Sequence, residues 1–387
     1  MDNYSNLFPP LPPEARRQLE NIPALIEKTF PMPGRFRAAL PANVAELSRL
    51  LTSGRGERGL SYLGQKPMLS AYLRYFLPWN LYRLCRLLPN LGLGLAAHDH
   101  VTDLGCGPLT LAAALWISRP DLREIPLEFH CIDRSGPVLE AGKIFFTALA
   151  GSNSSAEKCK WNIHTVKSEL NDAKLKPSSL ICAVNVFNEM FGDFSRSNAE
   201  KMKRNAEKAA KLLSGSGSGS AAMLIAEPGF PRCGEFISLL RKELLERGLS
   251  PSAPCTHGAA CPLSRQRWCH FAFETDDAPS ALLRLSAAAG IPKERAVISF
   301  LFMGLASSKP VPEDSLRVIS DAFPLPYNSF GRYCCSRHGL VLLSGEKNTI
   351  MEAASGSLAS AVLKKGKTDA KSGALLAQMP DCKKAAL

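Results

Sequence analysis

The sequence predicts an α/β protein with a doubly wound sheet, and three features favour this class. Apolar, strand-like segments alternate with helical segments from about residue 100 onward, as in strands joined by crossover helices. A turn containing two glycines follows the first of these strands, in VTDLGCGPLT, and Asp133 ends the second, in HCIDRS. The chain has 387 residues, of which 45% are hydrophobic, so it has enough apolar material for such a core.

The first 95 residues are expected to form a basic, helical N-terminal region. Segment 69–88 carries apolar residues at helical spacing, and Pro78 is expected to divide it into two helices. Such a segment suits an RNA surface, because rings stack on bases and guanidinium groups pair with phosphates. It equally suits an amphipathic cap that buries its rings and exposes its arginines. The alternating residues are Tyr72, Arg74, Tyr75, Trp79, Tyr82, Arg83 and Arg86, and further arginines precede them at 35, 37, 49, 55 and 58.

The remaining elements follow in chain order. Strands are expected at 100–105, 128–133, 179–187 and 221–229, with helices at 110–117, 136–149 and 199–213. The serine–glycine run at 214–220 predicts a flexible surface loop. A helix at 233–248 is followed by a cysteine-containing loop at 251–271, a strand at 297–305 and a hairpin at 330–345. This domain is expected to span 96–349, and the Ala/Gly/Ser/Lys-rich segment 350–387 is expected to be a disordered tail.

Charge and cysteine usage narrow the functional class. A net charge of +12 favours an anionic partner, most often nucleic acid. No targeting peptide is visible at the start, and the longest apolar run, 297–306, is about half of a membrane span. We therefore expect an intracellular protein that does not enter a membrane. In a reducing compartment the twelve cysteines are not expected to form a disulfide framework. Cys85, Cys131 and Cys182 are expected to be core residues.

The glycine turn indicates a nucleotide-cofactor pocket. Gly105 and Gly107 let the backbone turn sharply and approach a ligand, and the following helix offers its N-terminal amides. Asp133 stands at the end of the next strand, where in such folds an acid accepts hydrogen bonds from ribose hydroxyls. The D-x-G-x-G form, which begins at Asp103, resembles class I S-adenosylmethionine-dependent methyltransferases more than NAD enzymes. Leu109 stands where that motif usually has a third glycine, and its side chain could crowd the methionine end of the cofactor.

The segment NVFNEM, at the end of the strand at 179–187, is the candidate catalytic loop. Asn185, Asn188 and Glu189 are its polar residues at the pocket face, and hydrogen bonding within the loop is their alternative role. The loop lacks the Asn/Asp-Pro-Pro-aromatic signature of amino-group methylases and the Pro-Cys pair used for covalent attack on pyrimidines. The sequence therefore leaves open whether the chain is an enzyme.

The cysteine row indicates a metal or cluster site. Cys255, Cys261 and Cys269 are spaced C-x5-C-x7-C in a loop containing proline and glycine. Thiolates select zinc or iron–sulfur clusters. Structural zinc sites usually pair ligands as C-x2–4-C, so the wider gaps here favour a cluster. The candidates for a further ligand are Cys334 or Cys335 for a cluster, and His257 or His270 for zinc.

Several segments together resemble a methyltransferase-like family of small-ribosomal-subunit assembly proteins found in mitochondria and bacteria. They are YLRYFLPWNLYRL, VTDLGCGP, CIDRS, NVFNEM, AEPGFPRCGEFI and PCTHGAACPLSRQRWCHF. The resemblance covers about residues 60–345 and is most specific in EPG and the cysteine row. It implies a methyltransferase-type fold that binds S-adenosylmethionine, and a 4Fe–4S cluster on four cysteines. The implied cofactor residues are Asp103, Gly105, Gly107 and Asp133, and the implied ligands are Cys255, Cys261, Cys269 and one of Cys334 and Cys335.

The resemblance also implies a place of action. It suggests binding to small-subunit ribosomal RNA or a pre-30S particle, in the bacterial cytoplasm or the mitochondrial matrix, by a protein that is a monomer off the ribosome. Our first interpretation is an iron–sulfur protein that acts in ribosome assembly and translation. One alternative is an active RNA methyltransferase with a purely structural cluster. The other is a zinc-bearing methyltransferase with a non-ribosomal substrate.

Overall fold

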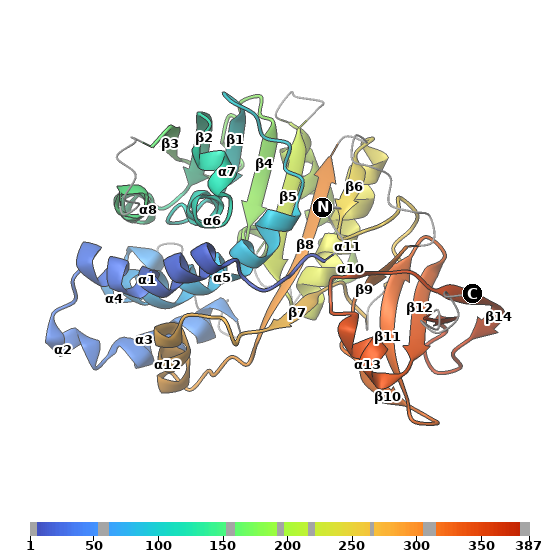
Figure 1. Cartoon of the computed structure of the whole chain (residues 1–387). Coiled ribbons are helices and arrows are strands. Elements are labelled where there is room, and N and C mark those ends of the chain that lie inside the picture. Colours follow the sequence, from blue (N-terminus) through green and yellow to red (C-terminus); the bar gives the residue numbers. More distant parts are fainter. Residues whose placement is uncertain are drawn as a thin grey trace.

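In the computed structural model of this chain, two β-sheets lie beside one another and the N-terminal helices pack to one side (Figure 1). The structure describes residues 6–52, 62–151, 159–191, 197–215, 221–263, 267–304 and 315–379. Arg55, Arg58, most of the serine–glycine run and the last eight residues lie outside these ranges. No helix within them is long and apolar enough to cross a membrane.

The main sheet has the strand order β3-β2-β1-β4-β5-β8-β6, and β7 also pairs with β8. Its strands are β1 (His100–Leu104), β2 (Leu127–Asp133), β3 (Trp161–Lys167), β4 (Leu180–Val184), β5 (Ala222–Pro228), β6 (Ser250–Ala253), β7 (Phe271–Glu274) and β8 (Arg295–Gly304). β1, β2, β4 and β5 are parallel, as the sequence predicts, and β3, which the sequence analysis missed, pairs in parallel with β2. In contrast, β8 is antiparallel to β5. The sheet is therefore mixed. The reason is that β8 starts beyond the carboxyl end of β5 and must run back along it.

Helices cover both faces of this sheet, which confirms the doubly wound prediction. Leu180 and Cys182 of β4 join the core beneath one set of helices, and Ile181 and Ala183 join the core beneath α10 and α11. The central strands β4 and β5 are buried on both faces and are nearly continuous apolar runs. The helices of the domain are α6 (Thr110–Ser118), α7 (Pro120–Arg123), α8 (Gly136–Gly151), α9 (Phe187–Met190), α10 (Ala199–Ser214), α11 (Pro231–Glu246) and α12 (Ser280–Ala288). Cys85, Cys131 and Cys182 are fully buried, as predicted.

The N-terminal helices form an outer layer over α6 and α8 (Figure 1). They are α1 (Pro13–Thr29), α2 (Gly34–Arg37), α3 (Leu40–Leu51), η2 (Tyr62–Gly64), α4 (Lys66–Ala71), the π-helix η3 (Tyr72–Phe76), α5 (Leu77–Leu87) and η4 (Leu88–Asn90). The expected break at Pro78 is not found, because the chain stays helical through it. Pro78 lies in the first turn of α5, and the turn before it widens to π, which accommodates the missing N–H of proline.

The aromatic residues of this segment support the cap interpretation rather than a stacking surface for bases. Tyr75, Trp79 and Tyr82 are at most 1% exposed, so their rings are core material. Trp79 donates a hydrogen bond to Ser286 Oγ of α12 at 3.3 Å. These rings fix the N-terminal layer to the domain and are not accessible to RNA.

The second sheet is formed by residues 316–378, in the order β13-β9-β11-β12-β15-β14 with β10 on β11. Its elements are β9 (Leu316–Val318), β10 (Phe323–Leu325), β11 (Ser329–Ser336), β12 (Gly339–Gly345), α13 (Lys347–Glu352), β13 (Leu358–Ala359), β14 (Val362–Thr368) and β15 (Leu375–Gln378). The disordered tail expected from residue 350 is not found up to residue 379. The reason is that β15 pairs in parallel with β12 and buries Ala377 completely.

Candidate functional site

The glycine loop, residues 105–109, connects β1 to α6. Gly105 and Gly107 have φ values of 62° and 54°, which glycine adopts without steric cost. A Cβ atom at Gly105 would lie 2.6 Å from Val186 Cγ2, so no side chain fits there. The loop is therefore kept thin beside the cavity described below.

Asp133, at the end of β2, holds this loop in place. Its Oδ2 accepts a hydrogen bond from the Gly107 backbone N–H at 3.0 Å, and its Oδ1 accepts one from the Ser135 N–H at 2.8 Å. Burial raises the pKa of the carboxyl group, and the two backbone hydrogen bonds oppose this shift. A carboxylate offers about four lone-pair positions, so capacity remains for hydroxyl groups of a ligand.

Asp103 lies beneath the loop and has no visible partner. Its carboxyl group is 1% exposed, and neither oxygen accepts a hydrogen bond within the described residues. Burial, and secondly the charge of Asp133, raise its pKa well above the usual value. It lines a cavity of about 20 Å³ with Tyr72 and Asn80. An isolated buried carboxyl group is costly, so this cavity suits a donor group such as an ammonium.

Leu109 does not obstruct the pocket, contrary to the crowding considered from the sequence. It adopts the left-handed conformation, with φ 58° and ψ 40°, that a glycine would take at this position. Its side chain is 1% exposed and packs on α8, where a Cβ at Gly142 would lie 3.0 Å from Leu109 Cγ. The leucine thus points away from the cavity because the glycine that accommodates it lies on α8.

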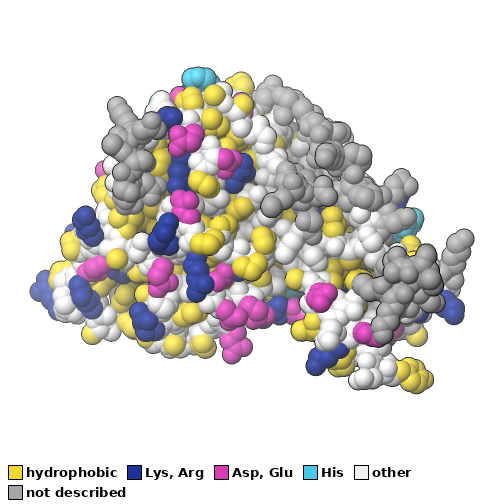
Figure 2. Space-filling view, in the orientation of Figure 1, with side chains coloured by type: hydrophobic (Ala, Val, Ile, Leu, Met, Phe, Trp, Pro, Cys, Tyr) yellow, Lys and Arg dark blue, Asp and Glu magenta, His cyan; other side chains and the backbone are white. Residues whose placement is uncertain are grey.

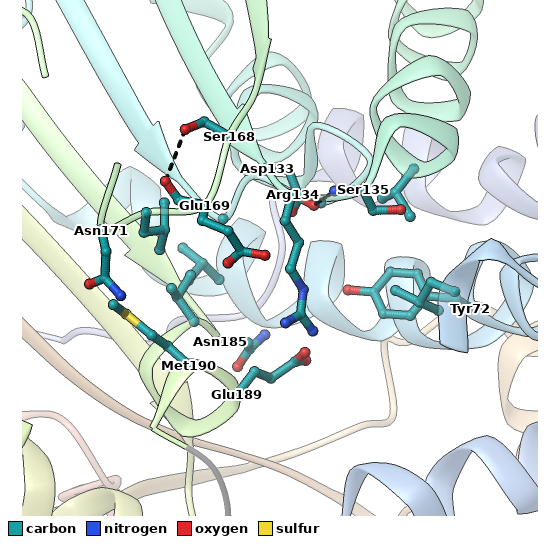
Figure 3. Close-up of a pocket in the computed structure, with 17 residues that line it drawn as sticks. Tyr72, Asp133, Arg134, Ser135, Ser168, Glu169, Asn171, Asn185, Glu189 and Met190 are labelled. Carbon is teal, nitrogen blue, oxygen red and sulfur yellow. Dashed lines mark hydrogen bonds between the residues drawn. The ribbon is translucent and has the colours of Figure 1, made fainter. Parts of the chain in front are cut away.

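A cavity of about 190 Å³ opens above the glycine loop. Figure 3 shows Tyr72, Arg134, Asn185 and Glu189 directed toward it from three different segments. Tyr72, which begins the π-helix, has a raised pKa because it is buried, with Glu189 and Asp133 adding to the shift. Sequence reasoning left Tyr72 either on an RNA surface or in an amphipathic cap. It did not single out Arg134, although Arg134 directly follows the acid of β2.

The three catalytic candidates separate into two environments. Asn185, at φ 57°, and Glu189 both line the cavity. Asn188 is 4% exposed and instead donates through Nδ2 to Glu227 Oε2. Asn188 therefore fastens the α9 loop, which is the alternative role considered for it.

Glu227 at the end of β5 is a buried acid that the sequence analysis missed. It is 1% exposed and accepts a hydrogen bond from the Phe187 N–H at 2.8 Å. Burial raises its pKa to about 7, although its hydrogen bonds to the α9 loop lower it. A charged residue directly after the apolar run AAMLIA was the available signal. Glu227 sets the position of the loop that carries Asn185 and Glu189.

Four of the five candidate cysteines come from both sheets and influence one another electrostatically. Cys255 follows β6, Cys269 precedes β7, and Cys335 comes from β11 of the second sheet. Burial is the main cause that raises the pKa of the Cys269 thiol, and the charges of Cys255, Cys261 and Cys335 follow. The charges of Cys255 and Cys261 also help to raise the pKa of the Cys335 thiol. The four sulfurs therefore lie within one another's electrostatic range.

Cys334 points the other way. It is fully buried in the core of the second sheet with Val318 and Val341, and none of the three loop cysteines affects its pKa. Adjacent residues on a strand face opposite sides, so only one of Cys334 and Cys335 can face the loop. It is Cys335 that faces the loop, and its sulfur lies 3.4 Å from His257 Nε2.

Two buried arginines border the four thiols. Arg241 of α11 is 3% exposed, and its Nη2 donates to the carbonyl oxygens of His257 and Ala259 at 2.6 and 2.9 Å. Arg317 of β9 is 1% exposed and donates to the carbonyl oxygen of Pro254 at 2.9 Å. Burial lowers the pKa of Arg317 to about 10, while Cys255, Cys269 and Cys335 act to raise it.

The thiols are not arranged around a single ion. Within the described residues no group of three or more His, Cys, Asp or Glu side chains could hold a metal ion. Four thiols and two guanidinium groups are nevertheless close enough to interact electrostatically. His270, the other zinc candidate, stacks on Trp268 at 4.7 Å between ring centroids.

Comparison with known proteins gives a family and a set of distant structures. The model of a family described as mitochondrial small ribosomal subunit Rsm22 matches residues 72–323. Among curated proteins, none matches the chain. The solved structures include the cyclopropane synthase MmaA2 from Mycobacterium tuberculosis, with 9% identity over 56% of this chain and 82% of that chain and a TM-score of 0.32.

Two further solved structures are methyltransferases. The precorrin-6y C5,15-methyltransferase from Geobacter metallireducens has 10% identity, covers 56% of this chain and 83% of that chain, and gives a TM-score of 0.30. The arsenic(III) S-adenosylmethionine methyltransferase CrArsM from Chlamydomonas reinhardtii has 15% identity, covers 62% and 79%, and gives a TM-score of 0.28. We base the fold assignment on the strand order and the glycine loop, which are those of a class I methyltransferase-like fold with a mixed sheet.

Proposed function

The chain belongs to the Rsm22 family of small ribosomal subunit proteins, and we propose that it binds small-subunit ribosomal RNA during assembly and holds both S-adenosylmethionine and a 4Fe–4S cluster. The observation that carries this proposal is the extent of the family match. Residues 72–323 include the glycine loop and the three loop cysteines. The family name refers to mitochondria, which agrees with one of the two compartments that the sequence resemblance implied.

The residues of the pocket fit S-adenosylmethionine. The unpartnered Asp103 carboxyl group would hold the ammonium of the methionine part, and the free lone pairs of Asp133 would accept the ribose hydroxyls. The thin backbone at Gly105 and Gly107 would allow close approach. When bound, the cofactor supplies an activated methyl group. Asn185 and Glu189 would orient an attacking RNA atom, so that proximity rather than a covalent enzyme group drives transfer.

The cysteine site fits a cluster on Cys255, Cys261, Cys269 and Cys335. A cluster ligated by four thiolates is anionic, and the buried guanidinium groups of Arg241 and Arg317 would balance that charge. Three ligands would come from the main domain and one from the second sheet, so metal binding would join the two. The free energy of binding would then stabilise the fold locally.

Metal analysis tests the cluster. The protein would be purified without oxygen and its iron, sulfide and zinc contents measured with the visible spectrum. We expect broad absorbance and about four irons per chain. One zinc in a colourless protein would contradict the cluster, and would favour a zinc site that includes His257, whose Nε2 is already 3.4 Å from Cys335 Sγ.

Sedimentation tests the ribosomal role. The purified protein would be mixed with immature and mature small subunits and run on sucrose gradients at several salt concentrations. We expect it to co-sediment with immature subunits, and the affinity to fall with salt because phosphate contacts release counterions. Failure to co-sediment at low salt would refute the proposed role.

Methyl transfer is a second candidate function, favoured by Asn185 and Glu189 lining the cavity. Tritiated S-adenosylmethionine would be supplied with the same particles and with naked RNA. Label in RNA would establish an enzyme. Bound cofactor without transfer would leave an assembly factor that uses the methyltransferase fold for binding alone.

A further inference from the structure

The arginines of the segment before the main domain do not all form ion pairs within the fold. Arg74 forms an ion pair with Glu27 at 3.1 Å, and Arg86 forms one with Asp277 at 2.8 Å. Arg83 has no carboxylate partner within the described residues. Its Nη1 donates to Asn80 Oδ1 at 3.1 Å, and its Nε is buried without a hydrogen-bond partner. Arg83 is therefore a half-buried cation that the fold leaves uncompensated.

A second cation lies beside it. Lys293 sits in the connection from α12 to β8, with Nζ 5.9 Å from the centre of the Trp79 ring. Burial lowers the pKa of Lys293 to about 8, and the only charged group that adds to this shift is Arg83. Within the described residues Lys293, like Arg83, has no ion-pair partner. Two like charges are thus held near each other in half-buried surroundings, which costs free energy unless an anion joins them.

The pair lies at the ligand-binding edge of the main sheet. β8 pairs antiparallel with β5, with Ile298 opposite Pro228, so Lys293, which precedes β8, lies beyond the carboxyl end of β5. Asn80, the hydrogen-bond partner of Arg83, lines the small cavity with Asp103. Ligands of doubly wound sheets bind at the carboxyl ends of the strands. The two cations are therefore neighbours of the cofactor pocket, on the side where a substrate would approach.

Net charge alone does not point to this place. On the face shown in Figure 2, Lys and Arg side chains over the N-terminal helices are interspersed with acidic ones. Some of the ion pairs of these helices are exposed, such as Arg49–Glu46 at 2.9 Å. An uncompensated pair of cations is a more specific signal for an anion than an excess of charge spread over a surface.

We propose that Arg83 and Lys293 form an anion site that holds a backbone phosphate of the RNA beside the cofactor pocket. This inference rests on the proposed RNA-binding function and gives it a location. Arg83 would offer its planar group of N–H donors and Lys293 a point charge, the two ways in which proteins bind phosphate. A phosphate held here would place an adjoining nucleotide next to Asn185 and Glu189.

RNA affinity tests the proposal directly. Binding of a short single-stranded RNA from the small subunit would be measured against salt for the wild type, Arg83→Gln and Lys293→Met. Each phosphate contact on a single strand contributes about 0.7 to the slope of log affinity against log salt. We expect each variant to lower the slope by about that amount. Matched controls are Arg204→Gln and Lys203→Met, exposed residues of α10 on the opposite face of the sheet.

A second measurement uses the wild-type protein and does not depend on a variant that folds. Pulse acetylation with mass spectrometry would follow the reactivity of Lys293, first with inorganic phosphate against chloride at equal ionic strength, then with the RNA. We expect RNA to protect Lys293 and phosphate to protect it only weakly. Strong protection by phosphate with none by RNA would overturn the proposal in favour of a free phosphate ligand.

The outcomes separate this inference from the proposed function. If the wild type binds RNA but the two variants keep its affinity and salt slope, the anion site is wrong and the RNA-binding function stands. If the wild type binds neither RNA nor small subunits, the proposed function fails and the inference fails with it. Melting temperatures of the variants would show that they are folded, and we expect no loss because each change removes a repulsion.

Discussion

Replacing Gly142 with alanine tests whether α8 positions the glycine loop for cofactor binding. A Cβ atom there would lie 2.7 Å from Pro108 C, 2.8 Å from Pro108 Cα and 3.0 Å from Leu109 Cγ. Carbon atoms in contact normally stay about 3.5–4.0 Å apart, so the loop and the helix would have to separate by about 1 Å. The first two contacts are to backbone, and no side-chain rotation can relieve them.

The size of the expected effect of Gly142→Ala follows from the strain that the added Cβ atom would cause. Overpacking of this kind costs about 1–3 kcal/mol, while alanine in place of glycine within a helix gains about 1 kcal/mol. The net effect on stability is therefore small. The effect on the cofactor is larger, because a displaced loop loses its contacts with the ligand. If the whole strain is expressed in binding, the dissociation constant rises by about 5- to 150-fold.

The assay is calorimetric titration with S-adenosylhomocysteine, which occupies the pocket without turnover. The matched control is Gly151→Ala on the same helix, where an added Cβ meets nothing within 4 Å. We expect the control to bind as the wild type does. Equal affinity of Gly142→Ala and the control would refute the coupling between α8 and the loop. Failure of the wild type to bind would instead refute the cofactor assignment.

Three further predictions concern the cluster, the N-terminal layer and the α9 loop. Cys335→Ser should lose iron, measured as iron per chain, while Cys334→Ser should keep it. The reverse result would show that Cys334 rather than Cys335 is the fourth ligand. Asp277→Ala should lower the free energy of unfolding in urea by about 3–5 kcal/mol, because it leaves Arg86, which is 8% exposed, without its ion-pair partner. The control Glu46→Ala, which removes an exposed carboxylate, should leave stability unchanged. Equal effects of the two variants would contradict this prediction. Burial raises the pKa of Glu227 to about 7 from an ordinary 4.5. The contribution of this group to the free energy of unfolding should therefore be greatest below pH 4.5 and fall until about pH 7. Glu227→Gln should reduce this pH dependence in urea titrations, and an unchanged pH dependence would contradict the assignment.

The parts of the fold that the sequence predicts are those with a local cause. Gly105 and Gly107 could be placed because their left-handed conformations are a property of the residues themselves. Strands β1, β2, β4 and β5 could be placed from their apolar patterns. Strand β3 lies at the edge of the sheet, is largely exposed and was not predicted. The direction of β8 could not be predicted, because its apolar sequence is the same whether it runs parallel or antiparallel to β5. Only the path of the chain through α12 decides it.

The same difference between local and long-range causes decides which site residues the sequence could predict. Cys334 and Cys335 are chemically identical neighbours, and the register of β11 with β9 and β12 determines which one faces the loop. That register arises between segments distant in sequence. The tail beyond residue 350 was misjudged for a related reason. Its Ala-, Gly- and Lys-rich composition suggests disorder, but β15 gains its order from pairing with β12.

The cysteine site and the cofactor pocket are joined by a continuous series of contacts. Trp268, next to Cys269, donates to the Gly229 carbonyl oxygen at 3.1 Å, and its ring packs where a Cβ at Gly234 would lie 2.7 Å away. The turn at Gly229 follows β5, whose Glu227 holds the α9 loop through Phe187 and Asn188. That loop presents Asn185 and Glu189 to the cavity.

An ordered cysteine loop therefore supports the α9 loop through the end of β5. Gly234 has no room for a side chain because Trp268 occupies the space, so the loop cannot shift without moving α11. Glu227 is buried and holds two residues of the α9 loop, so a shift at this end of β5 would alter the wall of the cavity. A cluster that orders Cys255, Cys261, Cys269 and Cys335 would thus also fix the shape of the cofactor pocket. Packing contacts alone would account for such a coupling, without any direct part for a metal in chemistry at the pocket.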